Sequence, residues 1–337
     1  MNQIILTTLF VTILVSGQAQ YVFKDKEPKN FFTDLQQGPA PKWSPHGKRF
    51  ALITNTKNKS KIAIITRDSI EFISGAQNNF EWSHDGRSII YTAKDENKLL
   101  KVFKYDLKTK ERVRISHNSN FSDFYPSISL GDSLIAYYNA GIGNKLQIPQ
   151  IYYANTNEGI AEKFIDDPKA EYFHPKWSPT GNLFLYWKSI DNKTIIEIIE
   201  IKTGRKIFSI DGGNYDFMDW SSDEQEILCT GNGKLLKLRL KDGLKTELSS
   251  SFQNIIGAKW SPKNDLITFD GDGNIYTINL KTLVQRQICS KGLDPNWHPS
   301  GNKIIFVKDE NGFPIYEVDI SGENLRLLFN GTKKKGK

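Results

Sequence analysis

Three short clusters of aromatic and polar residues are the part of this sequence best suited to binding a ligand. They recur at intervals of about 45 residues, and they contain Phe124, Tyr125, Tyr172, His174, Tyr215 and Asp216. Aromatic rings offer flat apolar surfaces, and a few carboxylate or imidazole groups among them can fix the orientation of a sugar or a peptide. We therefore expect these residues to form one binding surface. The alternative is that the rings only pack beneath the loops that carry them.

Residues for catalysis or for metal binding are harder to find. The histidines are His46, His84, His117, His174 and His298, and they show no spacing with Asp or Glu that is typical of a metal site. No G-x-S-x-G elbow, phosphate-binding glycine loop or Ser/His/Asp arrangement stands out. The run Asp270–Asn274 (DGDGN) has some likeness to a calcium loop, but it lacks the later glycine and acid, and we interpret it as a hairpin turn. We predict no cofactor and no metal.

A tryptophan-centred repeat positions the candidate residues. Its copies read PKWSPHGKRFAL, FEWSHDGRSII, PSISLGDSLIA, HPKWSPTGNLFL, MDWSSDEQEIL, AKWSPKNDLI and PNWHPSGNKII, with anchors at Trp43, Trp82, Ile128, Trp177, Trp220, Trp260 and Trp297. A period of about 40–45 residues with four short strands per unit is typical of a β-propeller blade. The sequence therefore predicts an all-β fold, a seven-bladed propeller of four-stranded antiparallel blades over residues 39–331, with six blades as the alternative.

The inner strand of each predicted blade ends at its anchor. Single blades cannot bury both apolar faces, so neighbouring blades must pack together, and the tryptophan supplies an apolar wedge at each seam. Ile128 replaces the tryptophan in blade three, and we expect a looser seam there. The binding candidates lie on the connections that enter the inner strands of blades three to five, at the channel mouth. The long connection 139–147 (NAGIGNKLQ) belongs to the same face.

The residue just before each anchor forms a second pattern. In blade order these residues are Lys42, Glu81, Ser127, Lys176, Asp219, Lys259 and Asn296, and their charges alternate between several neighbouring blades. If they lie near the channel, Lys42–Glu81, Lys176–Asp219 and Asp219–Lys259 should pair across the seams. Chance alternation is the other explanation.

The N-terminus carries the features of an export signal. An apolar run is followed by small residues at Gly17 and Ala19, which predicts a signal peptide over residues 1–19 and a lead-in over residues 20–38. No later apolar run is long enough to cross a bilayer. We therefore expect a periplasmic or secreted protein with no transmembrane segment after cleavage.

Charge and cysteine content limit the partners. The net charge of the 337-residue chain is +7, and four positive charges lie in a basic tail over residues 332–337 that we expect to be disordered. Nucleic-acid binding therefore has little support. Cys229 and Cys289 fall in an inner strand of one blade and the outer strand of the next, and we expect two buried free thiols.

The repeats resemble the TolB-type, WD-like propeller repeat, whose hallmark is W-S-P-D-G followed by an apolar strand. Here the motif stands as WSPHG, WSHDG, WSPTG, WSSDE, WSPKN and WHPSG. TolB itself carries an N-terminal α/β domain, for which residues 20–38 leave no room, so the resemblance implies the fold and not TolB's role. The seven-bladed oligogalacturonate lyases are also similar, and they use a histidine-rich metal site in the channel. Only His174, and less clearly His117, falls on that side here.

These observations favour an exported, non-catalytic propeller that binds an envelope or secreted protein, or a glycan, as a monomer. The alternative is a carbohydrate-active propeller lyase or hydrolase with its site at the channel mouth. An enzyme should show carboxylates or histidines in perturbed environments at the mouth, whereas a binding protein should show an aromatic, poorly ionisable surface.

Overall fold

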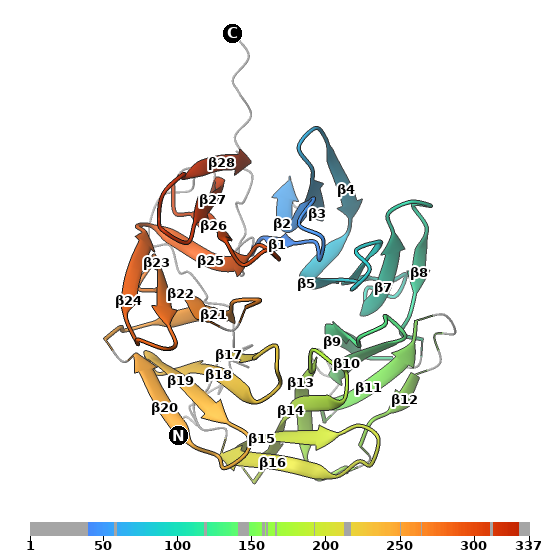
Figure 1. Ribbon diagram of the computed structural model, residues 1–337. Coiled ribbons are helices and arrows are strands. Elements are labelled where there is room, and N and C mark those ends of the chain that lie inside the picture. The colour runs from blue at the N-terminus through green and yellow to red at the C-terminus, as the bar shows by residue number, and fades with distance from the viewer. Residues whose placement is uncertain are drawn as a thin grey trace, which may run out of the picture.

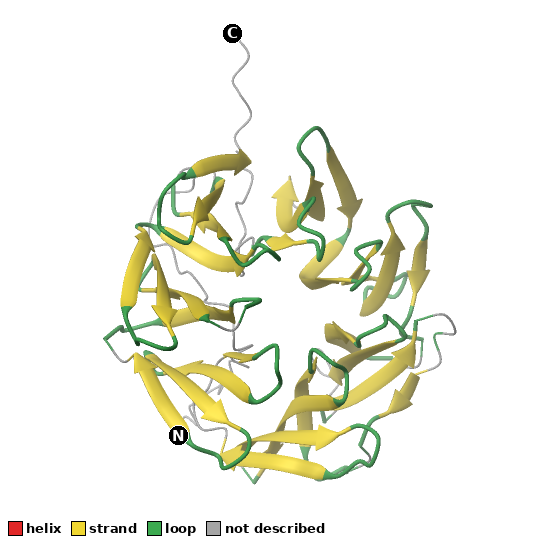
Figure 2. Ribbon diagram, viewed as in Figure 1, coloured by secondary structure: helices red, strands yellow, loops and turns green. Residues whose placement is uncertain are grey.

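The chain forms a ring of seven four-stranded antiparallel sheets around a central channel (Figure 1). This computed structural model describes residues 40–329 apart from residues 57–58, 118–119, 141–147, 157–158, 160, 166, 192, 212–216, 250, 264 and 311–312. Its ordered elements are all strands joined by turns and loops (Figure 2). In this described part, no helix has the length and apolar character needed to cross a membrane. The predicted all-β, seven-bladed propeller is confirmed, and the six-bladed alternative is wrong.

Each blade is one continuous run of four strands. Blade one contains β1 (Lys42–Trp43), β2 (Phe50–Thr56), β3 (Lys59–Ile65) and β4 (Ile70–Ser74); blade two contains β5 (Ala76–Trp82), β6 (Ser88–Lys94), β7 (Leu100–Asp106) and β8 (Arg112–Arg114). Blade three contains β9 (Ser122–Ile128), β10 (Leu134–Ala140), β11 (Gln150–Asn155) and β12 (Ala161–Lys163); blade four contains β13 (Glu171–Trp177), β14 (Leu183–Ile190), β15 (Lys193–Glu200) and β16 (Lys206–Asp211).

The remaining blades follow the same plan. Blade five contains β17 (Phe217–Trp220), β18 (Glu226–Gly231), β19 (Lys234–Arg239) and β20 (Lys245–Ser249); blade six contains β21 (Ile255–Trp260), β22 (Leu266–Gly271), β23 (Asn274–Asn279) and β24 (Gln285–Cys289). Blade seven contains β25 (Gly292–Trp297), β26 (Lys303–Lys308), β27 (Ile315–Asp319) and β28 (Arg326–Phe329). The first strand of each blade lies at the channel and the last lies at the rim (Figure 1).

Three inner strands are longer than the sequence predicted. Strands β5, β9 and β13 begin several residues before the expected starts and pair with β6, β10 and β14 across β-bulges. Phe124 and Tyr172 were expected on connecting loops, but they lie inside β9 and β13. The long partner strands offer backbone groups over this whole length, so the inner strands extend along them.

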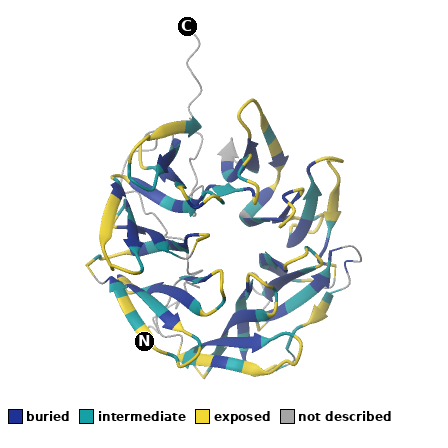
Figure 3. Cartoon of the chain, viewed as in Figure 1, coloured by how far each residue is buried: buried dark blue, intermediate teal, exposed yellow. Residues whose placement is uncertain are grey.

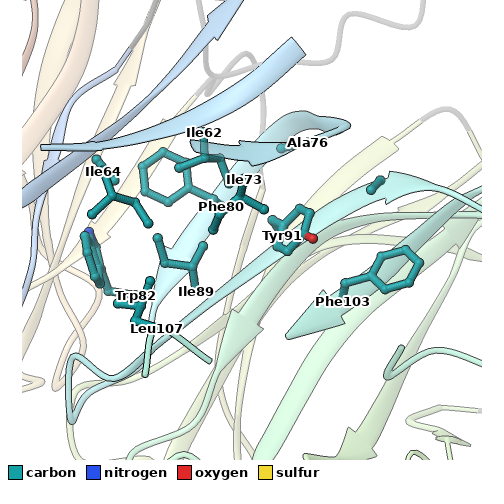
Figure 4. Close-up of a cluster of buried hydrophobic side chains, with 12 residues drawn as sticks. Ile62, Ile64, Ile73, Ala76, Phe80, Trp82, Ile89, Tyr91, Phe103 and Leu107 are labelled. Carbon is teal, nitrogen blue, oxygen red and sulfur yellow. The ribbon is translucent and has the colours of Figure 1, made fainter. Parts of the chain in front are cut away.

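Tryptophans fill the seams between blades. Trp82 packs with Ile62 and Ile64 of blade one and with Ile89 of its own blade (Figure 4). Its indole N–H donates to the backbone oxygen of Lys42 at 3.1 Å. Trp260 and Trp297 make the same bond to the residue before the preceding anchor, Asp219 and Lys259. Each such indole adds a directional bond to the apolar wedge, and burial accordingly concentrates in the inner part of the blades (Figure 3).

The seam between blades two and three is built differently. Ile128 is 7% exposed, within the 5–8% range of the five buried anchor tryptophans, so burial gives no sign of the looseness that we predicted. The same seam contains a buried ion pair in which Lys101 Nζ is 3.1 Å from Asp123 Oδ2, with side chains 0% and 2% exposed. Asn139 Nδ2 donates to the other carboxylate oxygen at 2.8 Å. This seam therefore combines apolar packing with buried polar contacts.

The ring closes between blades seven and one by side-chain packing. Both blades are sheets of their own four consecutive strands, and no other described strand joins either of them. Trp43 packs edge-on against His298, with ring centroids 4.8 Å apart. Leu52 and Leu293 meet in the cluster behind these rings. The predicted signal peptide, lead-in and basic tail lie outside the described residues.

Two smaller predictions concern the cysteines and the DGDGN run. Cys229 and Cys289 are both free, as predicted. The prediction of a buried thiol is confirmed for Cys229 and is wrong for Cys289 in β24, which is only half-buried. Burial raises the pKa of the Cys229 thiol to about 12. The DGDGN run is the hairpin turn between β22 and β23, with Asp272 and Gly273 at φ of 47° and 76°, as a two-residue turn requires.

Candidate binding site in the central channel

The inner strands of the blades enclose a channel cavity of about 330 Å³, near the lower limit for small-molecule sites. Two sets of side chains line it. The mouth tier consists of the residues three positions before each anchor, which are Ala40, Asn79, Tyr125, His174, Phe217, Gly257 and Asp294. The charged tier consists of the residues just before each anchor, namely Lys42, Glu81, Ser127, Lys176, Asp219, Lys259 and Asn296, and all of them except Asp219 line the cavity.

Backbone irregularities present the mouth tier to the channel. Strands β5, β9, β13, β21 and β25 each shift register against the next strand just before their anchors. At this point Tyr125, His174 and Asp294 have φ of 49°, 51° and 52°. A side-chain-bearing residue in the left-handed region is uncommon and costs free energy, and such residues gather at functional sites. The bulges mark this tier as a candidate site.

One side of the mouth is aromatic. The His174 ring lies between Tyr125 and Trp187, with ring centroids 4.8 Å and 4.6 Å away. Tyr125 also stacks on Tyr138. Burial among these rings lowers the pKa of His174 to about 4, so the imidazole is neutral at pH 7.

The charged tier contains the ion pairs that the sequence predicted. Lys42 Nζ is 2.9 Å from Glu81 Oε1, and Lys176 Nζ is 2.7 Å from Asp219 Oδ1. Lys259 Nζ is 3.9 Å from the same oxygen of Asp219. All three predicted pairs across seams are confirmed. Chance alternation therefore does not explain the pattern.

Several of these groups have shifted pKa values. Burial lowers the pKa of Lys259 to about 8, because the Asp219 carboxylate offsets only part of the cost of burying the ammonium. Burial also raises the pKa of Asp294 to about 6, against the opposing effects of the Ala40 backbone and Lys259. Asp219 is different, since Lys176 and Lys259 outweigh its burial and its pKa is lowered. The channel therefore holds ionisable groups that titrate near neutral pH beside its aromatic side.

The structure separates the predicted site residues. Tyr125 and His174 line the channel together. Phe124 instead stacks on Tyr138 at 5.4 Å, and Tyr172 is 2% exposed with its hydroxyl donating to Asp167 Oδ2 at 3.2 Å. For these two residues the packing alternative holds. Tyr215, Asp216 and most of the 139–147 connection lie outside the described residues.

Other channel residues were not among the predicted candidates. Asn79, Phe217 and Asp294 belong to the mouth tier, and Trp187 comes from the second strand of blade four. Aligning the repeats on their anchors would have brought the first three into one column with Tyr125 and His174. No pattern in the sequence marks Trp187, because it lies outside the repeat motif.

Three histidines lie in the turns after the anchors and connect each turn to the next blade. His46 is hydrogen-bonded to the Asp85 oxygen at 3.0 Å, His84 to Asp132 at 2.9 Å, and His298 to the Gly47 oxygen at 3.3 Å. His117 is bonded to the backbone of its own segment. Within the part of the chain that the structure describes, no three His, Cys, Asp or Glu side chains gather as metal ligands would.

Comparison with known proteins identifies the fold. No protein-family model matches the chain, and no curated protein matches its sequence. Oligogalacturonate lyase from Vibrio parahaemolyticus is similar, with a TM-score of 0.66 at 14% identity over 86% of this chain and 89% of that chain. The Cps50 (Swd1) β-propeller domain from Myceliophteria thermophila has a TM-score of 0.60 at 13% identity, over 84% of this chain and 97% of that chain. TolB from Acinetobacter baumannii has a TM-score of 0.48 at 14% identity, over 88% of this chain and 66% of that chain. At these identities the likeness concerns the fold alone.

Proposed function

We propose that this chain, a seven-bladed β-propeller of the TolB-like, WD-like kind, is an exported, non-catalytic protein that holds a glycan in the mouth of its channel. The observation that carries the proposal is the composition of the channel wall. Tyr125, His174 and Phe217 form an aromatic arc, and Asn79 and Asp294 add polar groups to the same wall. Sugars combine apolar ring faces with many hydroxyl groups, and they need both kinds of partner in one site.

Trp187 adds an apolar ring to this wall. Its indole is 8% exposed, and its N–H has no acceptor among the described residues. The indole nitrogens of Trp43, Trp177 and Trp220 are buried without an acceptor in the same way, so this feature does not mark Trp187 as a donor to a ligand. The small cavity also favours a sugar chain end over a protein surface, because stable protein interfaces bury on the order of 1,200 Å² or more.

The export part of the proposal rests on residues 1–19, which combine an apolar run with small residues at a cleavage position. We place the mature protein in the periplasm or the medium, where envelope glycans are within reach. Mass spectrometry of the N-terminal peptide of protein secreted by its host, starting at Gln20, would support this. An intact Met1 on the extracellular protein would contradict it.

Tryptophan fluorescence tests the binding site. Titration with a panel of envelope oligosaccharides should give a saturable change that disappears in Trp187→Phe. Tyr125→Asn, whose new residue tolerates a positive φ, should weaken binding at least tenfold. Phe72→Asn, at a 43% exposed ring on the outer strand of blade one, is the matched control and should bind normally. Capture of an envelope protein that survives Tyr125→Asn, with no response to any glycan, would refute the glycan site.

A second candidate function is a carbohydrate lyase or hydrolase. Lys259 and Asp294 favour it, because pKa values of about 8 and 6 suit proton transfer near neutral pH. Chromatography of each bound oligosaccharide after long incubation distinguishes the two functions. Unchanged ligand supports the binding protein, whereas shortened products that vanish in Asp294→Asn would establish the enzyme.

A further inference from the structure

The three lysines of the charged tier differ in their hydrogen bonds. Lys42 Nζ donates to Asn79 Oδ1, the Phe80 oxygen and Glu81 Oε1, at 3.0, 2.7 and 2.9 Å. Lys176 Nζ donates to the Met218 oxygen and to Asp219 Oδ1, at 3.0 and 2.7 Å. Among the described residues, Lys259 Nζ has no acceptor within hydrogen-bond distance.

The nearest carboxylate cannot serve Lys259 fully. Asp219 Oδ1 is engaged by Lys176, and Asp219 Oδ2 accepts the backbone N–H of Trp260 at 3.1 Å. Lys259 Nζ therefore stays 3.9 Å away from Asp219. Lys259 Nζ also lies over the face of the Phe217 ring, 4.0 Å from the centroid. The ring holds the ammonium in place by a cation–π interaction but offers no hydrogen-bond acceptor.

The charges of the channel limit what can bind there. Glu81 and Asp219 are paired with Lys42 and Lys176, which leaves Lys259 facing Asp294 as the other charged group of the wall. An ammonium that is three-quarters buried and incompletely paired costs free energy, and an anion would remove that cost. The three carboxylates oppose a doubly charged group such as phosphate. A singly charged carboxylate fits this balance.

We propose that Lys259, held on the Phe217 ring, is a subsite for the carboxylate group of an acidic sugar in the channel. This deepens the proposed function and rests on it. The sugar ring lies against the aromatic arc, and its carboxylate accepts a hydrogen bond from Lys259 Nζ. That bond supplies the acceptor which Asp219 does not provide.

A matched pair of ligands tests the subsite. Calorimetric titration would use an oligosaccharide containing glucuronic acid and its counterpart in which glucose replaces the acid. Lys259→Met should weaken binding of the acidic ligand about 10- to 100-fold, as loss of one charged hydrogen bond predicts, and should leave the neutral ligand unchanged. Lys259→Arg should retain most of the affinity. Lys281→Met, in an exposed turn of the same blade, is the control.

The outcomes separate this inference from the proposed function. If wild type binds the acidic and the neutral ligand equally well, and Lys259→Met binds them as wild type does, the carboxylate subsite is overturned and glycan binding still stands. Binding of neither ligand would overturn both. Lys259-dependent binding of an acidic peptide, without binding of the acidic sugar, would also overturn the proposal. Thermal melting of each variant shows whether it is folded. If Lys259→Met is not folded, the affinities of Lys259→Arg and wild type for the two ligands are compared instead.

The pH dependence offers an independent measurement. Lys259 faces Lys42, Glu81, Lys176, Asp219 and Asp294, and in their presence its pKa is about 8. Its charge is lost above that pH, so affinity for the acidic sugar should fall about tenfold per pH unit beyond pH 8. The neutral sugar should show no such fall. A flat profile for both ligands would contradict the proposal.

Discussion

The mouth tier combines two unfavourable features at single residues. Asp294 has a left-handed backbone and a carboxyl that is partly buried beside apolar groups, and His174 has the same backbone with a neutral imidazole. Neither feature helps the fold, because strain and desolvation both cost free energy. Residues of this kind persist where function offsets their cost. This agrees with a ligand site in the channel.

Asp294→Asn should therefore stabilise the protein at neutral pH. The pKa of Asp294 is about 6 in the folded protein against an ordinary value of 3.8. Between pH 3.8 and about 6, Asp294 is therefore protonated in the folded protein and has lost its proton in the unfolded chain. Wild-type stability then decreases as pH rises from about 4 to 6, and Asn removes this loss. We expect a gain of about 3 kcal/mol in the free energy of unfolding at pH 7.

Urea unfolding at pH 7 and at pH 4 measures this effect. The difference between Asp294→Asn and wild type should be large at pH 7 and near zero at pH 4. Asp319→Asn, in the outer half of the same blade, controls for removing a charge from blade seven. An equal difference at both pH values would show that Asp294 is not the titrating group.

Part of the site is predictable from the sequence because charge is visible when the repeats are aligned. The alternation of Lys42, Glu81, Lys176, Asp219 and Lys259 needs only the assumption that residues before the anchors face the channel. Phe124 and Tyr172 are misplaced by the same reasoning, because their burial depends on how far β9 and β13 pair with longer neighbours. Strand length and bulges are set by tertiary pairing, which a single sequence does not display.

At the scale of elements, the seams differ in what holds them. Most rely on a tryptophan wedge, whereas the seam of blades two and three buries the Lys101–Asp123 pair. Burial raises the pKa of Asp123 despite the opposing effects of Lys101 and Asn139. A buried pair of this kind adds little net stability, but removing one partner leaves the other charge uncompensated.

Lys101→Met should accordingly destabilise the protein by about 3–5 kcal/mol. Adding Asp123→Asn should restore part of this loss, since the amide needs no counter-charge. Both variants would be compared by urea unfolding, with the exposed Lys110→Met in blade two as the control. A cost below about 1 kcal/mol for Lys101→Met, in the range of surface ion pairs, would disprove the role of the pair.

At the scale of the whole molecule, the number of blades is predictable from the tryptophan repeat alone. Period, strand length and turn residues all agree across the copies, and such agreement is what specifies a fold. The manner of closure is not predictable in this way, because the repeat looks the same whether or not the ends exchange a strand. Among the described strands, none is exchanged between blades seven and one.

The closing seam should therefore be the first to open. β1 spans only two residues, and Trp43 at this seam is only partly buried, unlike the other anchor tryptophans. We expect backbone amides of β2 and β25 to exchange with deuterium at least tenfold faster than those of β18 and β21, which flank the seam of blades five and six. Mass spectrometry of native-state exchange would show this. Equal protection at both seams would contradict it.

The bulges of the inner strands have a consequence for protein engineering. Each one presents a single residue to the lumen, while the strand pairing resumes on either side. Since glycine, aspartate, tyrosine and histidine already occupy equivalent sites in different blades, the scaffold tolerates varied chemistry there. Randomising these few positions together would yield a library of receptors on one unchanged framework.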